Sequence, residues 1–310
     1  MPERRRRVLL VFVDGLGVGV KDPRRNPCFA TKPPFLLDLL GGRLPSLRNR
    51  EVESDSALCI AADANLGVKG LPQSGTGQAT LYTGVNCPRI IKQHFGPYLY
   101  STLKPVVEEH NVFEVLQEEE PPFSVALANA FPQRFFDYLQ GPRRRMVAGM
   151  YAALVSGVPF RDVTHLKRGE GISTDITAER WAQIGHPDAP VLTPYLAGKT
   201  LASVAEQYDF TLYEYFLTDK AGHEMDMEFA ARTLLNVDGL LRGLYDSIDL
   251  ENTLVLVTSD HGNIEEIGIK THTRNPVPVL LFGNRAGFDH GSVISIQHIV
   301  PAIRSFLLEK

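Results

Sequence analysis

The stretch Val8-Leu-Leu-Val-Phe-Val-Asp-Gly15 decides the fold of this chain. Six consecutive β-branched, aliphatic or aromatic residues are typical of a strand that is covered on both faces of a sheet. The run stops at Asp14, so a carboxylate stands where the strand ends. Similar apolar runs occupy residues 210–217, 253–258 and 277–282, with further candidates at 124–129 and 57–62. The sequence therefore predicts a largely buried sheet.

Segments with helical periodicity lie between these runs. Thr193 is a suitable N-cap, and Pro194 suits the first helical position that follows it. The expected helices cover residues 111–120, 193–208, 227–245 and 297–308. Strands that alternate with helices predict an α/β fold, a doubly wound and mostly parallel sheet with helices on both faces.

Residues 131–190 fit this alternation poorly. They hold five prolines, several glycines and the cluster Arg143–Arg145. Long irregular stretches in compact folds are usually functional, so we expect a small lid insertion over the site. We otherwise expect residues 1–310 to form a single domain, since 310 residues can bury a full core.

Composition and charge narrow the class of protein. The formal net charge of -4 gives no reason to expect nucleic acid or a membrane as a partner. The apolar run at 8–13 is too short for a membrane span or a signal-peptide core. Cys28, Cys59 and Cys87 are widely spaced, which favours unpaired thiols in a reducing compartment. We therefore expect a cytoplasmic protein.

Three carboxylates follow three of the predicted strands. Asp14 ends the first run, Asp219 follows the run at 210–217, and Asp260 follows the run at 253–258. Ligands of open α/β sheets bind beyond the carboxyl ends of the strands. The three side chains are thus expected to converge in one crevice, where they require positive charge between them.

Histidines accompany these carboxylates. His223 lies four residues after Asp219, His261 is adjacent to Asp260, and His272 follows a short loop later. A single histidine in a loop is more often structural than a ligand, but joint placement after strands favours a metal site. A mixed set of aspartate and histidine suits Zn²⁺ or Mn²⁺ better than Ca²⁺ or Mg²⁺.

A candidate nucleophile lies in the turn Gln73-Ser-Gly-Thr-Gly77. Ser74 would stand at a helix N-terminus, which favours an anion such as phosphate. A serine hydroxyl needs a base or a metal to act as a nucleophile at neutral pH. Thr76 is the alternative hydroxyl in the same turn.

The order of these motifs resembles the alkaline phosphatase superfamily, and within it the metalloenzyme branch that contains cofactor-independent phosphoglycerate mutase and phosphopentomutase. The similar blocks are Val13-Asp-Gly15, Gln73-Ser-Gly-Thr-Gly77, Asp219-Lys-Ala-Gly-His223, Thr258-Ser-Asp-His-Gly-Asn263 and Thr271-His-Thr-Arg-Asn-Pro-Val-Pro278. The resemblance covers roughly residues 7–85 and the chain from 210 onward.

The resemblance implies two divalent metal ions, Mn²⁺ or Zn²⁺, on either side of a serine that is transiently phosphorylated. One ion would be held by Asp14, Ser74, Asp260 and His261. The other would be held by Asp219, His223 and His272. Two such metals supply the charge neutralisation that phosphoryl transfer requires.

The chain departs from the mutases near the nucleophile. Gln78 stands where the mutases usually have a histidine, and Gln73 replaces an asparagine. The chain is also too short for the second domain that binds the sugar acid in phosphoglycerate mutase. Candidate anion holders, each more often a solvated surface charge, are Arg143–Arg145, Arg168, Lys199, Lys220 and Arg274.

The leading hypothesis is a phosphatase or phosphomutase that acts on a small phosphorylated metabolite through a phosphoserine intermediate. One alternative is cleavage of a phosphodiester or pyrophosphate on the same core. Another is a non-catalytic metal-binding module. Neither the substrate nor the oligomeric state follows from the sequence.

Overall fold

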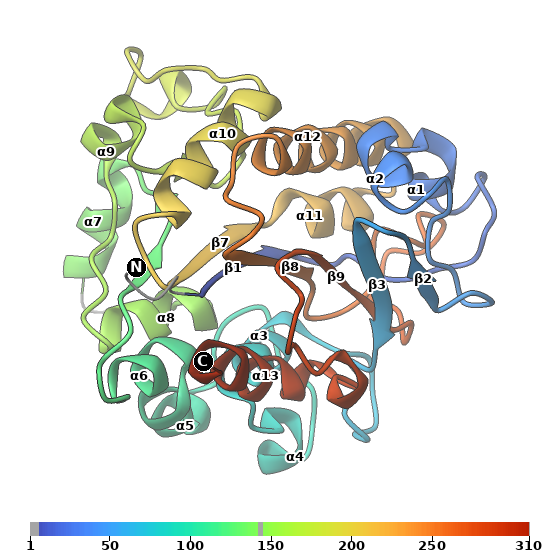
Figure 1. The fold of residues 1–310 in the computed structure, drawn as a ribbon, viewed down its shortest axis with the longest axis horizontal. Coiled ribbons are helices and arrows are strands. Elements are labelled where there is room, and N and C mark those ends of the chain that lie inside the picture. The colour runs from blue at the N-terminus through green and yellow to red at the C-terminus, as the bar shows by residue number, and fades with distance from the viewer. Residues whose placement is uncertain (1–5, 142–144, 310) are drawn as a thin grey trace.

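A seven-stranded sheet crosses the centre of the molecule in the computed structural model, which describes residues 6–141 and 145–309 (Figure 1). In spatial order its strands are β2 (Glu51–Glu53), β3 (Ala57–Ala62), β9 (Val277–Gly283), β8 (Thr253–Thr258), β1 (Arg7–Val13), β7 (Phe210–Tyr215) and β4 (Val125–Leu127). The apolar run at residues 8–13 is thus part of an interior strand.

The sheet is mostly, but not entirely, parallel. Strands β8, β1, β7 and β4 run parallel to one another, with Leu10 opposite Leu212 on one side and Leu256 on the other. Strand β9 is antiparallel to both β8 and β3, and β2 is antiparallel to β3. The loop from β8 to β9 carries no helix that could cross the sheet, so the chain returns antiparallel. The predicted α/β class is confirmed.

Helices cover both faces of the sheet (Figure 1). On one face lie α1 (Pro27–Thr31), α2 (Pro34–Leu39), α10 (Pro194–Ala205), α11 (Leu217–Glu224) and α12 (Met227–Tyr245). On the other lie α3 (Ser74–Thr83), α4 (Cys87–Ile91), α5 (Lys104–His110), α6 (Val112–Gln117), α8 (Ala148–Val155) and α13 (Ile299–Leu308).

Successive side chains of strand β1 point to opposite faces of the sheet and pack into two hydrophobic cores. Leu9 and Val11 pack into the core that includes α10 and α12, whereas Leu10 and Phe12 pack into the core that includes α3 and α13. Each such side chain contributes about 1.5–3 kcal/mol by its burial. This double burial explains why residues 8–13 of the strand are all apolar rather than alternating between apolar and polar.

Local signals set several helix ends. The Thr193 side chain accepts a hydrogen bond from the Leu196 backbone N–H and caps α10 as predicted. Asp226 caps α12 in the same way, and α12 covers the predicted range 227–245. Three of the predicted helices are shorter than expected, at Val112–Gln117, Pro194–Ala205 and Ile299–Leu308.

Two predicted strands end early. The run at 210–217 leaves the sheet after Tyr215, because Phe216 has helical backbone angles and α11 begins at Leu217. The run at 124–129 is divided into β4 and the short β5 (Asn129–Ala130), which pairs with β6 (Ile172–Ser173) outside the main sheet.

The stretch 131–190 is more regular than its sequence indicates. It contains α7 (Gln133–Gln140), α8 and α9 (Val163–Arg168). Helix α8 packs on α3, and Ala148 and Ala152 belong to the main core. That this stretch acts as a lid remains a prediction, as does the single-domain organisation. Within the described ranges, none of the helices has the length and apolar character that crossing a bilayer requires.

Candidate metal centre and active site

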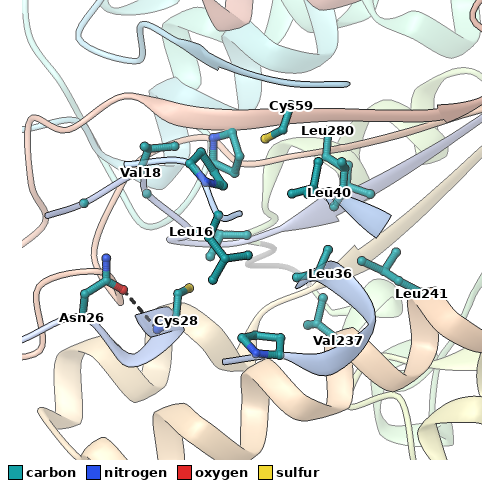
Figure 2. Close-up of a pocket in the computed structure, with 17 residues that line it drawn as sticks. Leu16, Val18, Asn26, Cys28, Leu36, Leu40, Cys59, Val237, Leu241 and Leu280 are labelled. Atoms are coloured by element: carbon teal, nitrogen blue, oxygen red, sulfur yellow. Dashed lines mark hydrogen bonds between the residues drawn. The ribbon is translucent and has the colours of Figure 1, made fainter. Parts of the chain in front are cut away.

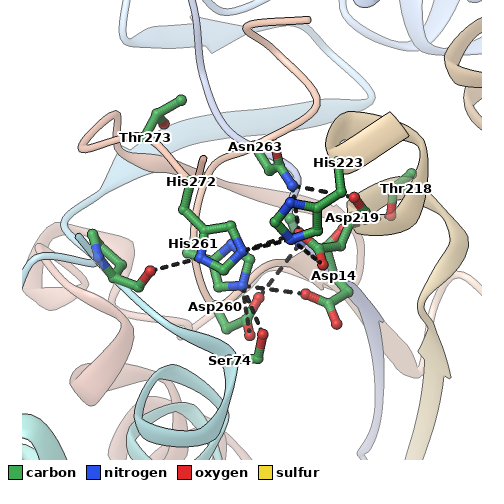
Figure 3. A network of polar contacts seen from close by, with 12 residues as sticks. Asp14, Ser74, Thr218, Asp219, His223, Asp260, His261, Asn263, His272 and Thr273 are labelled. Carbon is green, nitrogen blue, oxygen red and sulfur yellow. Dashed lines mark hydrogen bonds and ion pairs between the residues drawn. The ribbon is translucent and has the colours of Figure 1, made fainter. Parts of the chain in front are cut away.

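The three predicted carboxylates lie beyond three neighbouring strands of the sheet. Asp14 directly follows β1, Asp260 follows β8, and Asp219 lies in the first turn of α11, just after β7. Because β8, β1 and β7 are adjacent and parallel, their carboxyl ends share one edge. Figure 3 shows the three side chains turned toward a common point together with three histidines and Ser74.

The first group of contacts surrounds the His261 ring. Its Nε2 atom lies 3.0 Å from Ser74 Oγ and 3.5 Å from one carboxylate oxygen each of Asp14 and Asp260. All four residues are buried. Burial lowers the pKa of His261, which favours the neutral imidazole that metals bind.

The second group joins Asp219 to two histidines. One Asp219 oxygen lies 3.2 Å from His223 Nε2, and the other lies 3.4 Å from His272 Nε2. The two Nε2 atoms are themselves 3.0 Å apart. Helix α11 produces half of this geometry, because residues 219 and 223 are four apart and share one helix face.

Main-chain carbonyls fix the tautomers of these two rings. His223 Nδ1 lies 2.8 Å from the Lys270 carbonyl, and His272 Nδ1 lies 2.7 Å from the Pro72 carbonyl. A carbonyl only accepts, so each Nδ1 carries the proton and donates. In the neutral rings the two Nε2 lone pairs then face each other and Asp219. Such an array of acceptors requires a proton or a metal cation among them.

The pKa shifts of the carboxylates also indicate that a cation is required at this point. Burial raises the pKa of Asp14 well above its ordinary value, and the charges of Asp260 and Asp219 raise it further. Burial opposes ionisation of Asp219, but hydrogen bonds that His223 and His272 donate from Nε2 when their rings are protonated outweigh it and hold the pKa of Asp219 well below the usual range. Asp14 Oδ1 and Asp260 Oδ2 are buried and have no hydrogen-bond partner among the residues that the structure describes. The residues present thus fit divalent cations, as the mixed oxygen and nitrogen donors also do.

The structure separates the two candidate nucleophiles. Ser74 is the first residue of α3, and its hydroxyl faces the carboxylates and His261 (Figure 3). The Thr76 hydroxyl donates to the Gln73 carbonyl and accepts from the Phe95 backbone N–H. Thr76 is fully buried in these contacts, so the geometry favours Ser74.

Sequence reasoning assigned no role to several residues that orient the candidate ligands. Asn263 Nδ2 lies 2.7 Å from Asp219 Oδ1 and donates to it, and the Thr218 hydroxyl donates to the Asp14 carbonyl. Gln78 Nε2 lies 3.5 Å from Asp14 Oδ2, so the departure from the mutase pattern at 78 stands inside the site. Asn263 is the last residue of the motif Thr258-Ser-Asp-His-Gly-Asn263, so the motif could have indicated a role for Asn263 in the site.

A cavity of about 630 Å³ opens onto this centre. Asp14, Ser74 and Asp219 lie in its wall, together with Lys220 and Lys270. Of the candidate anion holders named from the sequence, Lys220 is the one in this wall. Arg143 and Arg144 lie outside the described residues.

A second cavity, of about 80 Å³, is almost wholly apolar (Figure 2). Leucine, valine and proline side chains line it, with Asn26 at one end and the thiols of Cys28 and Cys59. Burial raises the pKa of both thiols to about 12, so neither is a thiolate at neutral pH. This cavity lacks the groups that catalysis needs.

Comparison with known proteins agrees with this geometry. The model of the Metalloenzyme superfamily matches residues 192–302. The 2,3-bisphosphoglycerate-independent phosphoglycerate mutase of Pyrococcus abyssi is 25% identical over 189 residues, which are 60% of this chain and 42% of that protein. The enzyme of the same name from Desulforudis audaxviator is 31% identical over 108 residues, 33% of this chain and 21% of that protein. The chain thus spans less than half the length of these relatives.

Solved structures share the fold. The PH0037 protein from Pyrococcus horikoshii matches with a TM-score of 0.57 and 16% identity, over 99% of this chain and 98% of that one. Alkaline phosphatase from the Antarctic bacterium TAB5 matches with a TM-score of 0.51 and 10% identity, over 99% of this chain and 100% of that one. Residues 192–302 of this chain thus match the Metalloenzyme superfamily, part of the chain is similar in sequence to 2,3-bisphosphoglycerate-independent phosphoglycerate mutase, and its fold is that of alkaline phosphatase.

Proposed function

We propose that this protein is a metal-dependent phosphoryl-transfer enzyme, a phosphatase or phosphomutase that acts on a small phosphorylated metabolite through a phosphoserine at Ser74. One observation carries the proposal. The Ser74 hydroxyl lies 3.0 Å from His261 Nε2, at the point where the carboxylates beyond β1, β7 and β8 converge. A hydroxyl in such a place is suited to attack phosphorus.

Ser74 and the N-terminus of α3 would have different roles in phosphoryl transfer. Ser74 Oγ forms a bond to phosphorus while the bond from phosphorus to the leaving oxygen breaks. The N-terminus of α3, where Ser74 is the first residue, offers a favourable helix dipole to the phosphoryl oxygens. Transfer of the phosphoryl group from Ser74 to water would complete a phosphatase cycle, and transfer to another substrate hydroxyl would complete a mutase cycle.

Two divalent cations, Mn²⁺ or Zn²⁺, fit the two contact groups. Asp14, Ser74, Asp260 and His261 would hold one, and Asp219, His223 and His272 the other. When bound, they would lower the pKa of the serine hydroxyl and neutralise charge on the phosphoryl group. Asp14 Oδ1 and Asp260 Oδ2, which lack partners in the described part of the chain, and the facing Nε2 atoms of His223 and His272 support this assignment.

The cavity supports a small anionic substrate. Its volume of about 630 Å³ suits a metabolite, and Lys220 and Lys270 add positive charge at its wall. Lys220 also lies 3.5 Å from Glu224, so part of its charge is already compensated.

Ser74→Ala tests the proposal. We expect the variant to lose hydrolysis of p-nitrophenyl phosphate in the presence of Mn²⁺ or Zn²⁺, and to lose the phosphoryl group that intact-mass spectrometry should detect on the acid-quenched wild type. Ser203→Ala, an exposed serine on α10, is the matched control. Retained activity in Ser74→Ala together with its loss in Thr76→Val would transfer the role to Thr76. Hydrolysis of diesters more than ~100-fold faster than monoesters would favour the phosphodiesterase alternative.

A further inference from the structure

Glu265 is a fully buried carboxylate close to the metal centre, and the proposed chemistry does not use it. It lies in the loop after β8, four residues beyond His261. Within the described ranges, no lysine or arginine forms an ion pair with it. A buried carboxylate without a cationic partner must be stabilised by hydrogen bonds.

Four donors converge on this carboxylate. Oε2 accepts from the backbone N–H of Gly17 at 3.1 Å and of Asn263 at 2.8 Å. Oε1 accepts from Asn275 Nδ2 at 3.0 Å and from the Thr273 hydroxyl. The lone pairs of both oxygens are therefore directed at donors.

The donors belong to three different loops, and each loop carries candidate metal ligands. Gly17 lies three residues after Asp14, beyond β1. Asn263 lies two residues after His261, beyond β8, and Thr273 directly follows His272. One side chain thus ties together main-chain segments that supply ligands to both proposed ions.

The surrounding glycines show that the chain is built around this carboxylate. A Cβ atom added at Gly17 or at Gly262 would overlap the Glu265 carboxylate. Both backbones therefore approach the group more closely than any other residue type allows. Gly262 also pairs with Thr273 through the main chain, which closes the β8 loop onto the His272 loop.

We propose that Glu265 is a positioning residue for the metal centre, which sets metal affinity by holding the loops of Asp14, His261 and His272 in register. The inference rests on the metal centre of the proposed function. Glutamine at 265 would keep the shape but replace one acceptor oxygen by an NH₂ group that faces donors. Either the Gly17 and Asn263 loops or the Thr273 loop would then lose its anchor. Loss of partners that orient metal ligands typically lowers metal affinity 10–100-fold.

The test compares Glu265→Gln with Glu266→Gln. Glu266 is the adjacent glutamate and instead pairs with Arg25. We expect the Kd for Mn²⁺, measured by calorimetry on EDTA-treated protein, to rise about 10–100-fold in Glu265→Gln and to stay at the wild-type value in the control. The visible spectrum of bound Co²⁺ should change as well. A purely structural role would lower the unfolding temperature of the metal-free protein but leave the Kd and the Co²⁺ spectrum unchanged.

Thr273→Val provides a second variant if Glu265→Gln does not fold. It removes one donor to Oε1 and leaves three, so we expect a smaller rise in Kd in the same direction. If Glu265→Gln folds and binds Mn²⁺ with the same Kd as the wild type, the positioning role is overturned, but the proposed function is not. If Glu265→Gln does not fold, the same conclusion follows from an unchanged Kd in Thr273→Val. Failure of the wild type itself to bind Mn²⁺, Zn²⁺ or Co²⁺ would instead overturn the proposed function, and this inference with it.

Discussion

Replacing Glu214 with glutamine is expected to make the protein more stable relative to the wild type as the pH rises. Glu214 is a buried residue of β7, and one of its oxygens accepts a hydrogen bond from the Tyr82 hydroxyl at 2.7 Å. Its other oxygen has no partner within the described ranges. Burial raises the pKa of Glu214 from 4.5 to about 7, opposed by the Tyr82 hydrogen bond and supported by the charge of Asp260.

The sign follows from the raised pKa. A carboxyl group whose pKa is higher in the folded state contributes stability below its unfolded pKa and loses it as the pH rises through the folded pKa. Here the loss begins near 4.5 and continues through about 7. The ionised form then costs about 3 kcal/mol, of which about 2–3 kcal/mol appears between pH 5 and 8.

Urea unfolding of the EDTA-treated proteins at pH 5, 6, 7 and 8 measures this difference. Glutamine has the same shape, keeps an acceptor for Tyr82 and cannot ionise, so its advantage over the wild type should grow by that amount across the series. Glu118→Gln, an exposed glutamate at the end of α6, should show no such trend. A stability difference between Glu214→Gln and the wild type that does not change with pH would refute the reasoning.

Two further predictions concern the metal centre and its cavity. Addition of Mn²⁺ at 100 times its Kd to EDTA-treated protein should stabilise the fold by about 2.7 kcal/mol, seen as a rise of several degrees in the thermal unfolding midpoint. The His272→Ala variant should lose most of this rise in the unfolding midpoint. If neither Mn²⁺ nor Zn²⁺ changes the unfolding midpoint of the wild type, the metal assignment is contradicted. Lys220→Ala should raise KM for a phosphate monoester about two- to fivefold with little change in kcat. An exposed ion pair between Lys220 and the substrate phosphate would contribute up to about 1 kcal/mol, since Lys220 is also paired with Glu224. Lys199→Ala on α10 is its control, and equal KM values in the two variants would remove Lys220 from the substrate site.

The central strands of the sheet could be predicted from the sequence, because a strand that is buried on both faces appears as a continuous run of apolar residues. The central residues of strands β1 and β8 are all apolar, and the ends of these strands are followed by Asp14 and by Ser259-Asp260. The end of β7 was less visible, since Phe216 and Leu217 continue the apolar run while the backbone already turns into α11. Asp219 therefore lies on a helix rather than at a strand end, although it faces the same point.

Other features depend on contacts between distant residues, which a single sequence does not display. The packing of α8 on α3, for example, arises from tertiary arrangement. Glu265 looked like an ordinary loop glutamate, because its donors come from as far away as Gly17. The structure brings the predicted site residues together, while their roles as ligands and nucleophile remain predictions.

The anchoring of His223 and His272 has a consequence for how this site can change over evolutionary time. Their Nδ1 atoms are held by the main-chain oxygens of Lys270 and Pro72, and almost any residue at those positions would present the same oxygen. The side chain at 270 is consequently released from the task of orienting a histidine. It can be replaced to suit a different substrate while the ring beside it keeps its orientation.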